Sequence, residues 1–411
     1  MERILTTHAG SLVRPPELLE FLVAKERSEP LDEGAYADAL RRAAADTVRR
    51  QVEAGIDVVD DGEIGKATWI TYLYERVGGL ETRMVPLEGG NFLPPSRDRQ
   101  AFPEFYAEHD AAFAAQATNM MRRAGDAGAP TTDPDGAPAE GKVWVCVGPI
   151  TYDTAAVERD IANLKAALEG AHVTDAFLPV VAPASAYWLG NEYYASDEEF
   201  VYALADALHE EYERIVEAGF LVQVDDAVLL HEYDSILSLG GSVADYRKWA
   251  ELRVEALNHA LSGLPEERVR YHVCYGSWHG PHVFDPPLAE VIDLVLRVRA
   301  GAYSIEQANP RHEHEWQLWK DVELPEGKKL IPGVVTHHTN VVEHPEVVAD
   351  RLVRLADVVG GENVIGGTDC GFAQGAFVRR VHPSIQWAKL EALAEGARIA
   401  SRRLWGSKAA V

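Results

Sequence analysis

Short apolar runs alternate with amphipathic stretches along almost the whole of this 411-residue chain. Between most of the apolar runs, apolar positions recur at helical spacing, most clearly over residues 199–219 and 345–362. The first of these stretches ends in glycine, and the second begins with proline and closes near a glycine pair, which are common helix boundaries. The apolar runs are rich in valine, isoleucine and tyrosine and are predicted to be strands at residues 3–9, 56–62, 143–150, 176–183, 221–228, 268–276, 302–307, 329–335 and 363–369.

Strands that alternate with helices indicate an α/β fold with a parallel sheet. Nine candidate strands, one of them extra, predict a (β/α)8 TIM barrel, with residues 1–411 as a single domain. An open doubly wound sheet is the alternative, but no glycine-rich dinucleotide fingerprint follows the first strand. Residues 82–141 break the rhythm and are predicted to be an insertion after the second strand. Within it, the run "RRAGDAGAPTTDPDGAPAEGK" is typical of an exposed loop.

Charge and cysteine content narrow the function. The chain has 39 basic and 65 acidic residues, a net charge of -26, so it lacks the basic surface that nucleic acids or anionic membranes require. No apolar run approaches the ~18 residues of a membrane span, and the start "MERILTTHAGS" has no apolar signal core. Cys146, Cys274 and Cys370 cannot form a disulfide framework. We therefore expect a cytoplasmic protein in which a cysteine cluster serves metal binding or catalysis.

Active sites of such barrels lie at the carboxyl ends of the strands. His272 and Cys274 are two apart on a strand and therefore share a face. Glu306 ends the next strand, and Cys370 follows the last one, which barrel closure brings back toward the others. Cys146 lies in the middle of its run and is interpreted as a core residue. The polar residues that close strands are Ser11, Glu63, Asp225, Asp226, His272, Cys274, Glu306, His338 and Cys370.

One nitrogen, two sulfurs and one oxygen suit tetrahedral zinc better than magnesium or calcium. The alternative is a pair of buried structural thiols beside a hydrogen-bonded core histidine. Zinc would keep a substrate thiol ionised, whereas a free thiol with a pKa near 8.5 is only a few per cent thiolate at pH 7. Glu306, a hard ligand in a soft set, is expected to yield when a substrate sulfur binds.

The motifs "HVC", "SIEQA" and "DCG" together resemble the catalytic domain of cobalamin-independent methionine synthase, over residues 3 to about 375. The resemblance implies a zinc ion held by His272, Cys274, Glu306 and Cys370. It also implies methyl transfer from 5-methyltetrahydrofolate, or a related donor, to homocysteine. Weaker matches imply a Gly-Ser turn at Ser11, homocysteine contacts at Glu63 and Asp225, a pterin-stacking Trp188 and a proton-donating His338, with Asp226 as the second candidate acid.

Departures from the family pattern keep other functions open. Methionine synthases of this type have a long additional N-terminal half, and here no proline follows the Asp225–Asp226 pair. The chain instead resembles a shorter branch of the superfamily, which includes the zinc enzyme that opens epoxides with coenzyme M. Alkyl transfer to a non-amino thiol is therefore the alternative function. Extra polar residues are expected around the site at His279, His282, Asp285, Arg311, His312 and His314.

Each candidate also has a structural interpretation. Ser11 can cap a helix, Trp188 can form an aromatic lid, and Glu63 and Asp225 can bind loop amides instead of a substrate ammonium. We expect His312 and His314 to lie outside the ligand set. A non-catalytic, zinc-stabilised barrel or a sulfur-binding protein is the rival from another class, and the displaceable carboxylate argues against it. The expected partners are a small-molecule thiol and an alkyl donor. The sequence does not determine whether the protein forms a homo-oligomer.

Overall fold

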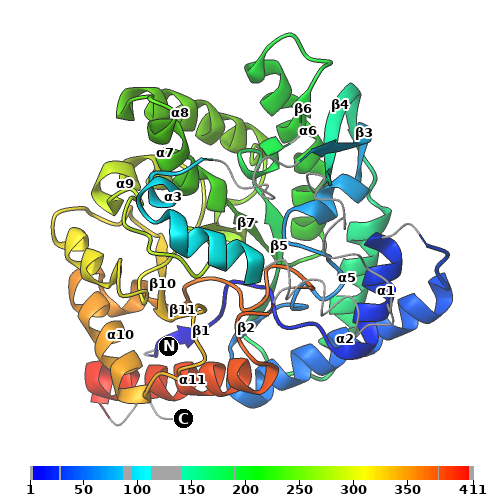
Figure 1. Ribbon diagram of the computed structural model, residues 1–411. Coiled ribbons are helices and arrows are strands. Elements are labelled where there is room, and N and C mark those ends of the chain that lie inside the picture. The colour runs from blue at the N-terminus through cyan, green and yellow to red at the C-terminus, as the bar shows by residue number, and fades with distance from the viewer. Residues whose placement is uncertain are drawn as a thin grey trace.

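The computed structural model describes residues 3–26, 29–86, 95–112, 140–188, 190–377 and 379–406. Its centre is an eight-stranded parallel sheet that curls into a barrel (Figure 1), which confirms the predicted fold class. In spatial order the strands are β1 (Leu5–Thr6), β11 (Ile365–Thr368), β10 (Lys329–Val335), β9 (Ala302–Ile305), β8 (Val269–Val273), β7 (Leu221–Asp225), β5 (Asp175–Val181) and β2 (Val58–Val59).

The two end strands, β1 and β2, meet through hydrogen bonds around Asp57. The backbone nitrogen of Asp57 donates to the carbonyl oxygen of Thr6 at 3.1 Å, and the backbone nitrogen of Thr6 donates to the Asp57 carboxylate at 2.9 Å. The Thr7 hydroxyl donates to the carbonyl oxygen of Val58 at 2.9 Å. These contacts join the edges that an open sheet would leave unpaired.

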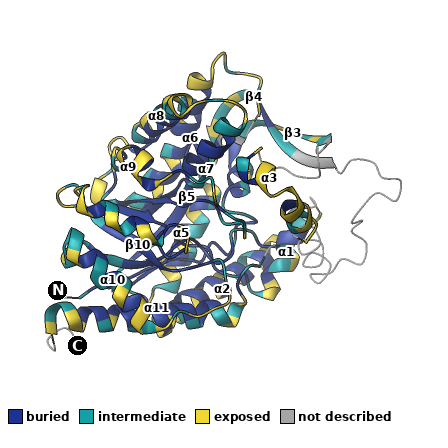
Figure 2. Cartoon of the chain, turned by 60° about the vertical axis from the view of Figure 1, so that its left-hand side comes forward, coloured by how far each residue is buried: buried dark blue, intermediate teal, exposed yellow. Residues whose placement is uncertain are grey.

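Helices surround the strands, with their apolar sides inward and their polar sides outward (Figure 2). The helix predicted over residues 199–219 is α6, which begins where the Ser196 hydroxyl accepts from the backbone nitrogen of Glu199 and is followed by Gly219 at φ 92°. The longer helices are α1 (Pro16–Glu26), α2 (Glu33–Ala54), α5 (Ala155–Ala167), α6 (Asp197–Glu217), α7 (Ala227–Ser238), α8 (Val243–Ala260), α9 (Leu288–Leu296), α10 (Pro345–Val359) and α11 (Pro383–Trp405). Short 3-10 turns are η1 (Thr71–Glu75), η3 (Ser185–Trp188), η4 (Glu266–Arg268), η5 (Glu313–Lys320) and η6 (Gly361–Asn363).

The ninth predicted strand lies outside the barrel. Residues 143–150 belong to β4 (Glu140–Tyr152), which pairs antiparallel with β3 (Val77–Pro86) and parallel with β6 (Gly190–Asn191). Val85 pairs with Gly141 here, so the two ends of the predicted 82–141 insertion lie side by side. Most of that insertion, including nearly all of its Gly- and Pro-rich loop, is outside the described residues.

Between those borders, residues 95–112 are described and lie across the carboxyl-terminal side of the barrel beside α7, with α3 (Arg97–Ala101) at their start (Figure 1). The backbone and guanidinium of Arg97 donate to the Asp234 carboxylate, and the Asp98 carboxylate accepts from the backbone nitrogen of Val283. The Trp278 indole donates to the Tyr106 hydroxyl at 3.1 Å. This segment therefore rests on α7 and on the loop that follows β8. Among the described residues, no helix is long and apolar enough to cross a membrane.

Candidate active site

The strand-end residues that the sequence singled out come from seven of the eight barrel strands, and most of them converge. His272 is the last residue but one of β8 and lies beside Asp225 of β7, with which it is in register. Glu63, Glu306, His338 and Cys370 follow β2, β9, β10 and β11. Because the carboxyl ends of parallel strands meet at one rim of the barrel, residues from distant parts of the chain share this small volume.

His272, Cys274 and Cys370 form the first cluster. Their ligand atoms all lie within 4.8 Å of one another, and all three side chains are buried. The Nδ1 atom of His272 is 3.1 Å from the Ser304 hydroxyl, which leaves Nε2 buried with no hydrogen-bond partner. An imidazole anchored at one nitrogen and free at the other is the usual state of a metal-binding histidine.

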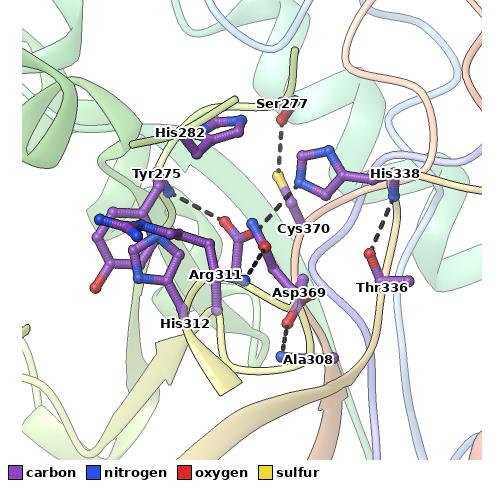
Figure 3. A network of polar contacts seen from close by, with 12 residues as sticks. Tyr275, Ser277, His282, Ala308, Arg311, His312, Thr336, His338, Asp369 and Cys370 are labelled. Atoms are coloured by element: carbon purple, nitrogen blue, oxygen red, sulfur yellow. Dashed lines mark hydrogen bonds and ion pairs between the residues drawn. The ribbon is translucent and has the colours of Figure 1, made fainter. Parts of the chain in front are cut away.

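The two thiols interact directly. The hydrogen bond from Cys274 lowers the pKa of Cys370 well below its ordinary value, and the same contact, together with burial, raises the pKa of Cys274. The Ser277 hydroxyl lies 3.3 Å from the sulfur of Cys370 (Figure 3). Two adjacent sulfurs beside an unpaired imidazole nitrogen fit a soft divalent metal ion such as zinc.

Glu306 is fully buried beside this cluster, and its negative charge also contributes to the raised pKa of Cys274. Its Oε2 accepts from the backbone nitrogen of Tyr275 at 3.1 Å, next to Cys274. Its Oε1 lies 3.1 Å from the Asn309 amide nitrogen and 3.2 Å from Nε2 of His338. The carboxylate therefore stands between the sulfur cluster and the histidines that follow β10.

The sequence analysis did not single out His337, which strand alternation continued past β10 would point away from His338. Instead, the ligand atoms of Glu306, His337 and His338 lie within 4.8 Å of one another. His337 is 0% exposed and both of its ring nitrogens lack a hydrogen-bond partner, whereas the side chain of His338 reaches the surface at 11%. The only feature of the sequence that could have indicated His337 is its place next to His338. Strand alternation does not set the direction of either side chain, because β10 ends at Val335.

Acidic side chains line the neighbouring wall. Asp225 is buried, and its raised pKa is due first to burial, with Glu63 adding to it and His272 opposing it. Glu63 has a left-handed backbone (φ 54°), and its buried Oε2 has no partner, while Oε1 lies 3.6 Å from Nζ of Lys66. Strained backbone and unpaired buried carboxylate oxygen are common features of binding sites.

Ser11 lies at the same rim, on the loop after β1. The backbone nitrogen of Phe372 donates to the carbonyl oxygen of Ser11 at 2.8 Å, and a Cβ built on Gly371 would overlap the Ser11 hydroxyl. Ser11 therefore packs against the two residues that follow Cys370 in the chain. The side chain of Trp188 is outside the described residues.

Asp226 is not brought together with the cluster. Its two carboxylate oxygens accept hydrogen bonds from Ser185 at 2.9 Å and Tyr271 at 2.8 Å. Asp226 lies one residue beyond the end of β7, and these two partners hold its side chain away from the cluster, whereas that of Asp225 lies near His272.

A second polar network lies beyond the cluster. His312 contacts Asp285 through Nε2 at 2.9 Å and Glu315 through Nδ1 at 3.0 Å, and its ring stacks on Tyr275 with centroids 3.5 Å apart. The Nδ1 atom of His282 lies 2.9 Å from the same Asp285 oxygen, and the backbone of His282, like that of Glu63, has a positive φ. His314 is exposed. His312 therefore belongs to this separate ion-pair network, whereas His314 lies at the surface.

Arg380 is a further residue that the sequence reasoning did not single out. Burial lowers its pKa to about 10, and the nearby charge of Cys370 opposes that effect. Its Nε donates to Gln374 at 3.3 Å, and the described residues supply no carboxylate partner for its guanidinium. Arg380 also contributes to the lowered pKa values of His279 and His337, so a cation stands near this side of the site.

Comparison with known proteins finds a family model and several relatives that this chain resembles. Residues 188–387, which include His272, Cys274, Glu306 and Cys370, match the family model of the cobalamin-independent synthase catalytic domain. The resemblance to the cobalamin-independent methionine synthases is confirmed. The chain is 24% identical to a methionine synthase of Thermococcus kodakarensis over 401 residues, which cover 97% of this chain and 94% of that protein.

Two further proteins place the chain in context. It is 23% identical to the 2-hydroxypropyl-CoM lyase of Xanthobacter autotrophicus, over 93% of this chain and 90% of the lyase. The solved structure of a B12-independent methionine synthase from Shewanella sp. W3-18-1, in complex with selenomethionine, superposes with a TM-score of 0.69 at 21% identity. That alignment covers 98% of this chain and 99% of the other, so the two share the whole fold.

Proposed function

We propose that the protein is a zinc-dependent methyltransferase that methylates the thiol of homocysteine. The observation that carries the proposal is the buried cluster of His272, Cys274 and Cys370, in which Nε2 of His272 lacks a partner. Glu306 would supply the fourth ligand from beside Cys274. Zinc in this set would keep the substrate thiol ionised at neutral pH.

The surrounding residues can bind and orient the acceptor. Glu63 and Asp225 would together present two acidic side chains to the ammonium group of homocysteine, and Oε2 of Glu63, which lacks a hydrogen-bond partner, would accept from it. Ser11 would contact the amino acid from the opposite side, next to Cys370. Trp188 would stack on a pterin ring of the donor.

The reaction also needs a proton. As the bond between sulfur and the methyl carbon forms, the bond between the methyl carbon and the donor nitrogen breaks, and its electron pair stays on that nitrogen. Protonation of the nitrogen then makes the leaving group neutral. His338 is our proton donor, because its ring lies at the rim of the site and Glu306 holds its Nε2. Asp226 is the second candidate, although Ser185 and Tyr271 already occupy both of its oxygens.

A second function, alkyl transfer to a non-amino thiol such as coenzyme M, is favoured by one observation. The guanidinium of Arg380 has no carboxylate partner among the described residues and lies near Cys370. A sulfonate would suit this cation, and the lyase of Xanthobacter autotrophicus is similar to this chain over most of its length.

Zinc content and thiol binding test the proposal together. Purified protein should contain about one zinc per chain, which Cys274→Ser and Cys370→Ser should remove, while Cys146→Ser, in β4 outside the barrel, should keep it. When homocysteine is added, zinc-edge X-ray absorption should show one additional sulfur ligand at a zinc–sulfur distance of ~2.3 Å. If only coenzyme M does so, the second function holds. If neither thiol changes the spectrum, the zinc is structural and the proposal fails.

A further inference from the structure

A buried ion pair joins α11 to the loop that follows β10. The side chain of Lys389, in α11, is 0% exposed, and its Nζ donates to Oε2 of Glu343 at 2.8 Å. The side chain of Glu343 is only 9% exposed. Glu343 lies near the end of residues 336–344, which connect β10 to α10 and are called the β10–α10 loop below.

The same carboxylate also reaches the start of this loop. Oε1 of Glu343 accepts from the backbone nitrogen of Thr336 at 2.9 Å. The Thr336 hydroxyl in turn accepts from the backbone nitrogen of His338 at 3.2 Å (Figure 3). A continuous series of contacts therefore links the ammonium group of Lys389 to the backbone of His338.

Apolar packing holds little of the β10–α10 loop. Asn340, Val341 and Val342 are exposed, Val341 at 70%. Hydrogen bonds hold the loop instead: besides the contacts of Glu343, Oδ1 of Asn340 accepts from the backbone nitrogen of His382 at 2.8 Å, just before α11. Since β10 ends before the loop begins, these polar contacts, and not the sheet, set the direction of the side chains that the loop carries.

Stability alone is a poor explanation for this pair. When an ammonium and a carboxylate are buried together, the loss of their hydration offsets most of their attraction. Well-packed apolar side chains of similar volume usually stabilise a fold as well or better. The charged pair is therefore better explained by the conformation that it imposes on the loop.

We propose that Lys389 and Glu343 are positioning residues that hold the β10–α10 loop so that His338 can give its proton to the alkyl donor. This inference rests on the proposed function of His338. Lys389 acts only through Glu343, and neither side chain contacts the cysteine cluster. Loss of the pair should therefore lower kcat and leave zinc and thiol binding unchanged.

The double variant Lys389→Met/Glu343→Met tests the inference, because it removes both charges and leaves no buried ion unpaired. Urea unfolding, zinc content and the KM for homocysteine should stay close to those of the wild-type protein. We expect kcat to fall by roughly 10–100-fold, because a catalytic group that is no longer oriented loses much of its effect. The backbone amides of Thr336 and His338 should exchange faster with solvent.

The matched control is Arg403→Met, which breaks an exposed ion pair between α11 and Asp350 of α10. It should change neither kcat nor amide exchange in the loop. In a His338→Asn background, the Lys389→Met/Glu343→Met change should lower turnover no further, because the group that the pair positions is absent. An unchanged kcat in the wild-type background, or an equal loss in both backgrounds, overturns the inference.

The inference and the proposed function fail in different ways. If the wild-type protein methylates no thiol, the proposed function fails, and amide exchange alone decides whether the pair orders the loop. If methyl transfer occurs and the double variant keeps its kcat, only the inference fails. If the double variant does not fold, Lys389→Met/Glu343→Gln takes its place, because the amide keeps the shape of Glu343 but loses its ionic contact with α11. A fall in kcat that depends on His338 then supports the inference, and an unchanged kcat overturns it.

Discussion

The main chain of Gly371 lies directly against the side chain of Ser11, and this contact joins the loops that follow β11 and β1. A Cβ at Gly371 would overlap the Ser11 hydroxyl and stand 3.0 Å from the Ser11 backbone nitrogen. The backbone nitrogen of Phe372 holds the same loop by donating to the Ser11 carbonyl oxygen at 2.8 Å. Since Cys370 immediately precedes Gly371, the position of the proposed zinc ligand depends on the absence of a side chain here.

Gly371→Ala should therefore damage the site. We expect a loss of about 1–3 kcal/mol in unfolding free energy from overpacking, with weaker zinc and thiol binding. Ser11→Ala in the same chain should restore part of the loss, because it removes the atom with the worst overlap. Gly375→Ala, whose Cβ would meet its nearest atom at 3.6 Å, is the control. Urea unfolding and zinc content measure the effect, and equal behaviour of the two alanine variants would contradict it.

The acidic wall should select an amino-acid thiol. Homocysteine should bind more tightly than its deaminated analogue if, as we propose, Glu63 and Asp225 both contact its ammonium group. Glu63→Gln or Asp225→Asn should each reduce that preference by roughly 1.5–3 kcal/mol, the usual worth of a charge-assisted hydrogen bond. Calorimetric titration with both thiols measures the preference. Equal affinities in the wild-type protein would favour a non-amino thiol as the acceptor.

His338 and Asp226 should respond differently to substitution. His338→Asn should slow turnover by roughly 10²–10⁴-fold, the range expected for loss of a general acid, with zinc content and thiol binding unchanged. Asp226→Asn should chiefly lower stability, by about 1–3 kcal/mol, because the amide cannot accept from both Ser185 and Tyr271. Single-turnover rates and urea unfolding separate the two effects. A slow but fully stable Asp226→Asn protein would make Asp226 the better candidate acid.

The buried His312 should make stability depend on pH. Burial lowers its pKa, but the hydrogen bonds to Asp285 and Glu315 outweigh burial and raise the pKa to about 9. The folded state thus holds a proton that the unfolded chain releases near pH 6.5. This stabilisation, at most about 3 kcal/mol, is fully present below pH 6.5 and is lost as the pH rises to about 9.

Urea unfolding between pH 6 and 9.5 should show this loss in the wild-type protein and a flatter profile in His312→Gln. His314→Gln is the matched control, because His314 is two residues away and exposed. Parallel profiles for wild-type and His312→Gln proteins would show that His312 does not carry the effect.

The sequence by itself determined the pattern of elements and much of the site. Alternating apolar strands and amphipathic helices permit few folds, so eight of the nine predicted strands form the barrel. The two-residue period of a strand placed His272 and Cys274 on one face, and the rule that strand ends meet at one rim brought Cys370 beside them. These relationships follow from local periodicity and chain order, which a sequence displays directly.

Only the tertiary structure decided three other features. Residues 143–150 leave the barrel because their partner, β3, is far away in the sequence, and no local pattern records that pairing. His337 joins Glu306 and His338 because alternation stops with β10, after which the loop conformation sets side-chain directions. Asp226 faces Tyr271 rather than the cluster because Tyr271 of β8 and Ser185 of η3 offer it hydrogen-bond partners there. In each case long-range contacts outside the regular strand, rather than its periodicity, determine where the side chain lies.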